Sequence, residues 1–122
     1  MQVRTGIDLI ELTRLEQAIQ RHGARFLERI FTPDELAETS GRPDSLAGRF
    51  AAKEAVVKAL GTGIGPIAWK EIEIRRGPQR EPVLHLHGLA KEKAAELGLH
   101  AWSVSLSHTE HYAAAVAVAL GE

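Results

Sequence analysis

Glu54 and Lys58 are four residues apart in a stretch, residues 46–65, whose composition predicts a helix followed by a glycine-rich turn. This spacing places both side chains on one helix face, and Arg49 and Lys53 form a second pair with the same spacing nearby. Acids, cations and a flexible turn in so short a stretch indicate a helix that handles a phosphate ligand. The plainer alternative is an ordinary surface ion pair between Glu54 and Lys58, worth ~0.2 to 0.5 kcal/mol.

Asp8 is a second candidate carboxylate. It follows a short strand expected at about 3–7, at the point where a helix is expected to begin. There a carboxylate either caps the helix or extends from the end of the strand to a ligand. If Asp8 lies close to Glu54, two carboxylates and several waters would form a hard-oxygen site suited to Mg²⁺. The separation in sequence does not decide between these alternatives.

The segment GTGIG, with Gly61, Gly63 and Gly65, would allow the backbone to approach a ligand closely. It lacks both the six-position spacing of a dinucleotide fingerprint and the Lys-Ser/Thr ending of a P-loop. By itself the segment is therefore a weak motif.

Histidines and serines near the C-terminus allow two further interpretations. His85 and His87 point the same way from a predicted strand and could bind a transition metal, although no third ligand is evident nearby. Ser107 with His108 could form part of a serine hydrolase, but no nucleophile elbow supports this. His108 is better placed to contact a phosphate or a base, and the plain alternative is a turn histidine.

Four arginines, Arg14, Arg21, Arg25 and Arg29, give the N-terminal helical region a local positive charge. They could meet an acidic partner. More commonly, charges between helical apolar residues are simply the solvated face.

Composition limits the class of protein. The 122 residues fit one domain, and 15 Lys and Arg against 16 Asp and Glu give a net charge of −1, which indicates neither a nucleic-acid nor a membrane partner. The chain has no cysteine, so disulfides and thiolate metal sites are excluded. The apolar run at 113–120 is too short to cross a bilayer, and no signal peptide is evident. We expect a cytoplasmic protein.

The pattern of apolar residues predicts an α+β fold, with helices early and a mostly antiparallel sheet late. A helix from Asp8 should end near Gly23 and be followed by a short helical piece. Thr32 to Glu35 spell a capping box with proline at the first helical position. A long central helix should span 45–60 and end at Gly61. Strands are expected around Ile72 and Ile74, at 83–87, around 102–106 and at 113–120, the last covered on both faces, with a helix at 89–97.

Four segments together resemble the bacterial holo-[acyl-carrier-protein] synthase family, the small phosphopantetheinyl transferases. They are GIDLIEL at 6–12, RFLERIFTPDEL at 25–36, LAGRFAAKEAVVKALGTGIG at 46–65 and VSLSHTEHYAAA at 104–115. The resemblance covers nearly the whole chain, 1–122, as a single transferase domain. It implies the family's α+β fold and Mg²⁺-dependent transfer of 4'-phosphopantetheine from coenzyme A to a serine of an apo acyl carrier protein.

The resemblance also implies roles for individual residues. Asp8 and Glu54 match the metal carboxylates, and Lys58 matches a lysine that neutralises the coenzyme A pyrophosphate. Arg49 and His108 match residues at the 3'-phosphate and adenine end, and the segment from Gly61 through Thr62 and Gly63 to Gly65 would line the nucleotide groove. Arg14, Arg25 and Arg29 match basic positions that receive the carrier protein. The proton acceptor for the serine is left open between Glu54 and a metal-bound water.

The resemblance further implies a homotrimer with active sites between subunits. The main rival hypothesis is a non-catalytic trimeric module that binds a nucleotide or a carrier protein in the same groove. A serine hydrolase built on Ser107 and His108 ranks third.

Overall fold

The computed structural model describes all 122 residues as five strands, four α-helices and one 3-10 turn. In chain order they are β1 Gln2–Glu11, α1 Leu12–Ile30, α2 Pro33–Thr39, α3 Pro43–Leu60, η1 Trp69–Glu71, β2 Ile72–Arg76, β3 Pro82–Leu86, α4 Gly88–Glu96, β4 Leu99–His108 and β5 Tyr112–Gly121. The predicted α+β class is confirmed. None of the helices is long and apolar enough to cross a membrane.

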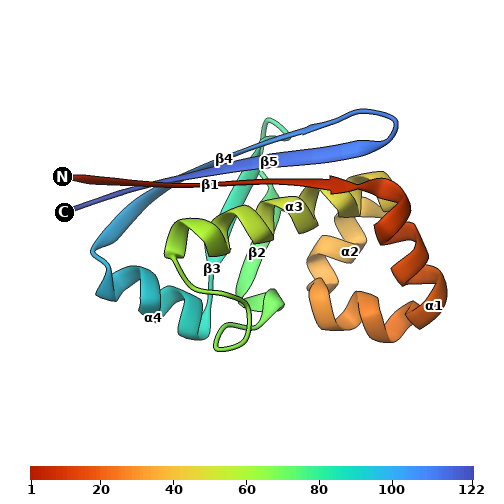
Figure 1. The fold of residues 1–122 in the computed structure, drawn as a ribbon, viewed down its shortest axis with the longest axis horizontal. Coiled ribbons are helices and arrows are strands. Elements are labelled where there is room, and N and C mark those ends of the chain that lie inside the picture. Colours follow the sequence, from red (N-terminus) through yellow and green to blue (C-terminus); the bar gives the residue numbers. More distant parts are fainter.

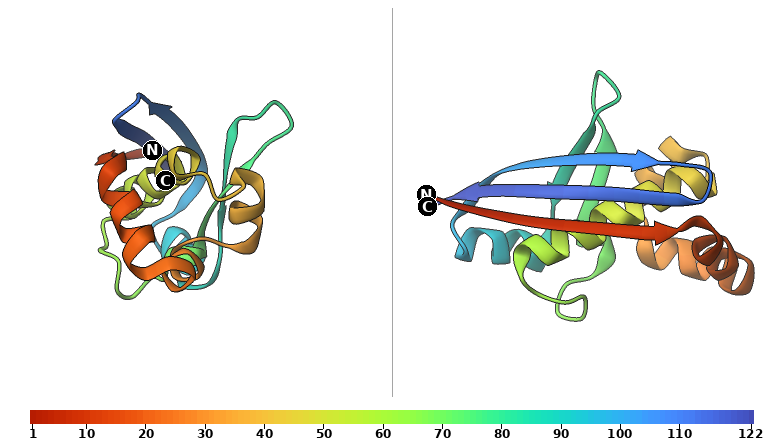
Figure 2. Two further views of the ribbon diagram at one scale, coloured as in Figure 1. Left: turned by 90° about the vertical axis from the view of Figure 1, so that its right-hand side faces the viewer. Right: turned by 45° about the horizontal axis from the view of Figure 1, so that its top comes forward.

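The larger sheet has the strand order β1-β5-β4, with both neighbouring pairs antiparallel. The three strands run side by side along the molecule, and the two chain ends lie together at one end of it (Figures 1 and 2). Because β5 is in the middle, β1 forms one edge of this sheet and β4 the other. Ten residue pairs join β1 to β5, from Gln2 and Gly121 to Glu11 and Tyr112.

Helix α3 lies along one face of this sheet (Figure 1). Small side chains on both elements make the contact: Ala51 and Ala55 of α3 are fully buried, as are Ala117 and Ala119 of β5. Small residues bring the backbones of helix and sheet close together. Side chains that project between the two elements are therefore also held close together.

Strands β2 and β3 form a separate two-stranded hairpin, whose tip projects beyond the larger sheet (Figure 2). Helix α4 follows it and leads into β4. Helices α1 and α2 lie at the opposite end of α3 from α4 (Figure 1).

Several predicted element boundaries are confirmed. Gly23 interrupts α1 with non-helical angles, φ 56° and ψ −135°. The capping box at the start of α2 is complete, because Thr32 accepts from the Glu35 amide and the Glu35 side chain accepts from the Thr32 amide. Helix α3 ends at Gly61, which has a left-handed φ of 76°. It begins at Pro43, two residues before the predicted start.

Two predictions were wrong. The first strand does not end at Asp8 but continues to Glu11, because its whole length pairs with β5. Asp8 is therefore a mid-strand residue and caps no helix. Strand β5 is covered on only one face: Val116 and Leu120, on the face away from α3, are 36% and 37% exposed. Within the chain, only the α3 side has a packing partner.

A buried ion pair fixes the opposite side of α3. The Lys53 ammonium contacts Glu35 Oε1 at 2.8 Å and donates to the carbonyls of Trp69 and Ile72, and both charged side chains are fully buried. Glu35 Oε2 also accepts from the Ile74 amide at 2.8 Å. These contacts join α2, α3, η1 and β2. Burial lowers the pKa of Lys53, while the charge of Glu35 opposes that shift.

Candidate functional site

Asp8, Glu54 and Lys58 come together at the β1 edge of the larger sheet. Asp8 lies on the face of β1 that packs on α3, because it is two residues from buried Gly6 and side chains two residues apart on a strand share a face. The Lys58 ammonium is 3.2 Å from Asp8 Oδ1 and donates to the Ile7 carbonyl at 2.8 Å. The structure thus joins two segments that are fifty residues apart in sequence.

Asp8 lies close enough to Glu54 to affect the charge of that carboxylate. Burial, and then the charge of Asp8, raise the pKa of Glu54, while Lys58 acts in the opposite direction. Asp8 Oδ2 is buried and has no hydrogen-bond partner. A buried carboxylate oxygen without a partner is costly, and a cation bound between the two carboxylates would remove that cost.

The donor set fits a hard divalent cation that keeps much of its water. Two carboxylates are available, and no group of three or more His, Cys, Asp or Glu side chains gathers anywhere in the chain. Mg²⁺ is commonly bound by one or two carboxylates together with water and substrate phosphates. A zinc-type site would need more protein ligands than are present here.

Arg49 is not beside this cluster. It is 7% exposed, and its Nη1 donates to Glu38 Oε1 and to the Ile74 carbonyl, both at 2.8 Å. Arg49 and Lys53 therefore form no second charged pair on the Glu54 face. Both turn towards α2 and β2, where they join elements of the fold.

His108 is at the far edge of the sheet from Asp8. It pairs with Ala113 of β5, which in turn lies next to Ile10 on β1 in the register. Two strand spacings, about 10 Å in total, therefore separate the backbone of His108 from β1. Within one chain the structure does not bring His108 to the Asp8–Glu54 pair.

The glycine-rich segment leaves the end of α3 next to Lys58. A Cβ at Gly61 would lie 2.9 Å from Arg4 Nη2, the end of a flexible side chain that can shift, so it is the left-handed φ that favours glycine here. Gly65 also has a positive φ, 150°, and Gly63 does not. Thr62 Oγ1 is buried without a partner. Thr62 lines a cavity of about 230 Å³ together with α4 side chains, including Lys93.

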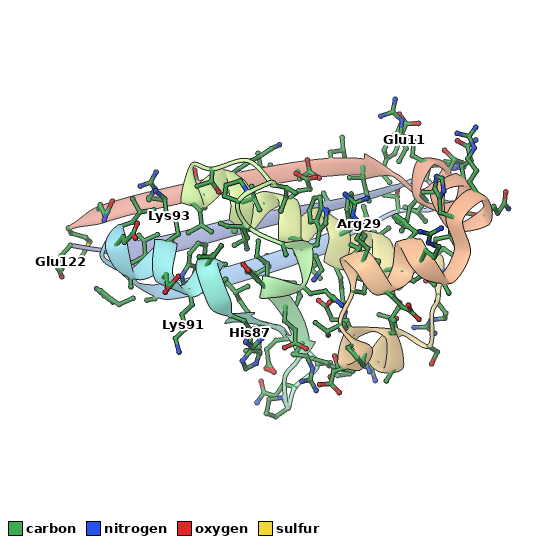
Figure 3. The ribbon with its side chains drawn as sticks, turned by 90° about the horizontal axis from the view of Figure 1, so that it is seen from below. Glu11, Arg29, His87, Lys91, Lys93 and Glu122 are labelled. Carbon is green, nitrogen blue, oxygen red and sulfur yellow. The ribbon has the colours of Figure 1, made fainter.

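The three predicted carrier-binding arginines line two adjoining hollows. Arg25 and Arg29 line one of about 720 Å³, and Arg14 lines one of about 440 Å³. Phe26 and Phe50 belong to both hollows. Figure 3 shows Arg29 at the α1 end of the molecule.

Phe50 and Trp69 are residues of this region that sequence reasoning missed. Their rings pack at a tilt of 37° with centroids 5.0 Å apart, and both line the larger hollow. Phe50 precedes Glu54 by four residues, so the two side chains lie on neighbouring turns of one face of α3. The spacing Phe50–Glu54–Lys58 could have indicated this stripe.

Neither of the two other histidine interpretations gains support, and no third side chain joins His85 and His87 as a metal ligand. His87 Nε2 contacts Glu73 Oε1 at 3.0 Å, and His87 and Lys91 project on the β3–α4 side (Figure 3). Ser107 and His108 are adjacent in β4 and therefore point to opposite faces of the sheet. They cannot act together as nucleophile and base within one chain.

Comparison with known proteins shows which family the chain belongs to. A model of the 4'-phosphopantetheinyl transferase superfamily matches residues 4–117. The holo-[acyl-carrier-protein] synthase of Moorella thermoacetica is 51% identical, covering 95% of this chain and 92% of its own. That of Herpetosiphon aurantiacus is 47% identical, covering 96% and 98%.

Solved structures of holo-[acyl-carrier-protein] synthases have folds similar to that of this chain. The crystal structure of Helicobacter pylori holo-[acyl-carrier-protein] synthase in complex with coenzyme A has a TM-score of 0.87 at 36% identity, covering 95% of this chain and 99% of that chain. The Neisseria meningitidis synthase has a TM-score of 0.87 at 34% identity, covering 96% and 97%. Because both the family model and the relatives match nearly the full length, the chain belongs to the 4'-phosphopantetheinyl transferase superfamily.

Proposed function

We infer that this protein transfers the 4'-phosphopantetheine group from coenzyme A to a serine hydroxyl of an apo acyl carrier protein, releasing adenosine 3',5'-bisphosphate. The observation that supports this most directly is the buried, unpartnered Oδ2 of Asp8 beside Glu54 and Lys58, in a chain of this family. Phosphoryl transfer needs positioning and charge neutralisation more than covalent help from the protein, and this cluster provides both.

We propose that Asp8 and Glu54 hold Mg²⁺, which would neutralise the pyrophosphate of coenzyme A. The Lys58 side chain is 53% exposed, so its ammonium can leave Asp8 and contact the same pyrophosphate. We propose either Glu54 or a metal-bound water as the acceptor of the serine proton, since a carboxylate that ligates a metal is a poor free base.

The remaining predicted contacts are also proposals. Gly61, Thr62, Gly63 and Gly65 would line the groove for coenzyme A beside Lys58. Arg49 and His108 are proposed for its 3'-phosphate and adenine end. Arg14, Arg25 and Arg29 would receive an acidic carrier protein at the two hollows.

We propose a homotrimer with active sites between subunits. The face of the larger sheet away from α3 is rich in exposed apolar side chains, among them Val3, Ile7, Leu9, Val116 and Leu120. Exposed apolar patches of this kind are typical of interfaces. His108 lies two strands from Asp8 in its own chain, so a site that uses both would draw on two subunits. Native mass spectrometry tests the assembly, and a species of one chain mass would contradict it.

Intact-protein mass spectrometry tests the reaction. An apo acyl carrier protein is incubated with this protein, coenzyme A and Mg²⁺, with EDTA added to a parallel sample. We expect the carrier to gain the mass of one phosphopantetheine only when the metal is present. Glu122→Gln is a matched control for Glu54→Gln, because the Glu122 side chain is 82% exposed at the far end of the sheet. We expect Glu122→Gln to retain full transfer.

The rival binding-module hypothesis predicts a different result in the same experiment. Coenzyme A would bind, as measured by calorimetry, but the carrier would gain no mass at any Mg²⁺ concentration. A cytoplasmic location stays a prediction, which cell fractionation would test.

A further inference from the structure

Gly6 allows an unusually close approach between β1 and α3. A Cβ placed on Gly6 would overlap the carbonyl oxygen of Ala55 and would lie 2.8 Å from its carbonyl carbon and 3.0 Å from the Ala59 amide nitrogen. These are backbone atoms of α3, which no side-chain rotation can move aside. Any side chain at position 6 must therefore push the strand and the helix apart.

This close contact is next to the carboxylate pair. Asp8 is the next residue on the same face of β1, about 7 Å along the strand from Gly6. Glu54 directly precedes Ala55, the residue whose carbonyl Gly6 faces. The distance between the β1 and α3 backbones at Gly6 thus sets how close Asp8 can come to Glu54 and Lys58.

Arg4 acts on the same two elements one step further along β1. Its Nε donates to the Ala59 carbonyl at 2.8 Å, near the C-terminus of α3. A cation is favourable there, because the last carbonyls of a helix are unpaired and the helix end has partial negative charge. Arg4 also packs against Gly61, where a Cβ would lie 2.9 Å from its Nη2.

We propose that Gly6 and Arg4 are positioning residues for the transfer reaction: Gly6 allows, and Arg4 maintains, the strand–helix spacing that holds Asp8 against Glu54. The proposal rests on the function proposed above. It assigns the glycine of the GIDL segment a packing role rather than a contact with ligand.

Gly6→Ala tests the proposal, with Gly121→Ala as a matched control. A Cβ at Gly121 would overlap the Gly98 carbonyl oxygen and lie 2.8 Å from its carbon, a similar clash at the far end of the sheet. Each variant is measured well below its own unfolding temperature. Mn²⁺ serves as the probe, because loss of its free-ion electron paramagnetic resonance signal reports binding without coenzyme A or turnover.

We expect Gly6→Ala to bind Mn²⁺ at least 10-fold more weakly than wild type. We expect its transfer rate at saturating coenzyme A to fall by about 100-fold, the effect of a misplacement of about 1 Å. Gly121→Ala should lose stability but keep wild-type Mn²⁺ affinity and transfer. A folded Gly6→Ala protein with wild-type values of both would overturn the proposal.

Arg4→Met provides the test if Gly6→Ala does not fold, because it removes the clamp without adding bulk to the interface. We expect weaker Mn²⁺ binding in the same direction, by about 3-fold, and recovery in Arg4→Lys. Unchanged Mn²⁺ binding in a folded Arg4→Met would then overturn the proposal. If wild type itself neither binds Mn²⁺ nor transfers, the proposed function fails, and the two failures are thus distinguishable.

Discussion

At the scale of single residues, the site places the Asp8 carboxylate where its charge makes ionised Glu54 less favourable. The pKa of Glu54 is raised by burial and by Asp8, and Asp8 Oδ2 is buried without a partner. Such an arrangement costs folding free energy unless a cation binds, and it is therefore evidence for function rather than for structure.

Glu54→Gln should make the metal-free protein more stable at neutral pH. The pKa of Glu54 is higher in the folded state than in the unfolded state. The free energy of unfolding therefore falls as pH rises between the two pKa values, because the folded state holds the proton more tightly. Glutamine has no such loss. We expect a gain of about 1 kcal/mol or less at pH 8 and none at pH 4, measured by urea unfolding.

The same variant should lose transfer by at least about 100-fold. Added Mg²⁺ should stabilise wild type but not Glu54→Gln, since only wild type retains both carboxylates. Equal stabilisation of the two proteins would remove Glu54 from the metal site.

Lys58→Met should bind Mn²⁺ more tightly than wild type while transferring more slowly. In the metal-free protein the Lys58 ammonium contacts Asp8 Oδ1 at 3.2 Å and so competes with a cation for that oxygen. Removing one positive charge near a divalent ion favours binding by about 3- to 10-fold after screening. Lys91→Met, on exposed α4, is the control, and tighter binding there as well would contradict the assignment.

At the scale of elements, α3 has different tasks on different faces. Ala51 and Ala55 pack under the sheet, Glu54 and Lys58 face β1 at its edge, and Lys53 faces α2 and β2. The buried Lys53–Glu35 pair therefore holds the helix in place behind the site rather than taking part in it.

Lys53→Met should cost about 3 to 5 kcal/mol of unfolding free energy, because it leaves the buried Glu35 carboxylate without its cation. Lys91→Met, an exposed position on α4, should change it by less than about 0.5 kcal/mol. Urea denaturation of both variants measures the difference. A small loss for Lys53→Met would mean that Glu35 is adequately satisfied by its backbone donors alone.

Elements with local signals could be predicted from the sequence, and those fixed by distant pairing could not. The α2 capping box and the ends of α3 and α1 depend on residues next to one another, such as Thr32 with Glu35. The extension of β1 to Glu11 depends on pairing with β5, more than a hundred residues away. The contacts of Arg49 could not be predicted for a similar reason, since its partners Glu38 and Ile74 are remote.

At the scale of the whole molecule, the chain leaves open features that a neighbouring chain could complete. One sheet face has exposed Ile7, Leu9 and Val116, and the two candidate ligand-binding edges, with Asp8 and His108, are separated by β5. A protein of this length builds a large cleft more readily from two chains than from one.

Subunit mixing tests that arrangement directly. If each site takes Glu54 from one chain and His108 from its neighbour, Glu54→Gln and His108→Ala proteins should each have little activity alone. Co-expressed in equal amounts, every mixed trimer would contain one intact site of three. Since about three quarters of random trimers are mixed, about one quarter of wild-type transfer should return. If both residues instead act within one chain, no mixed trimer has an intact site, and transfer should stay at the level of the inactive parents.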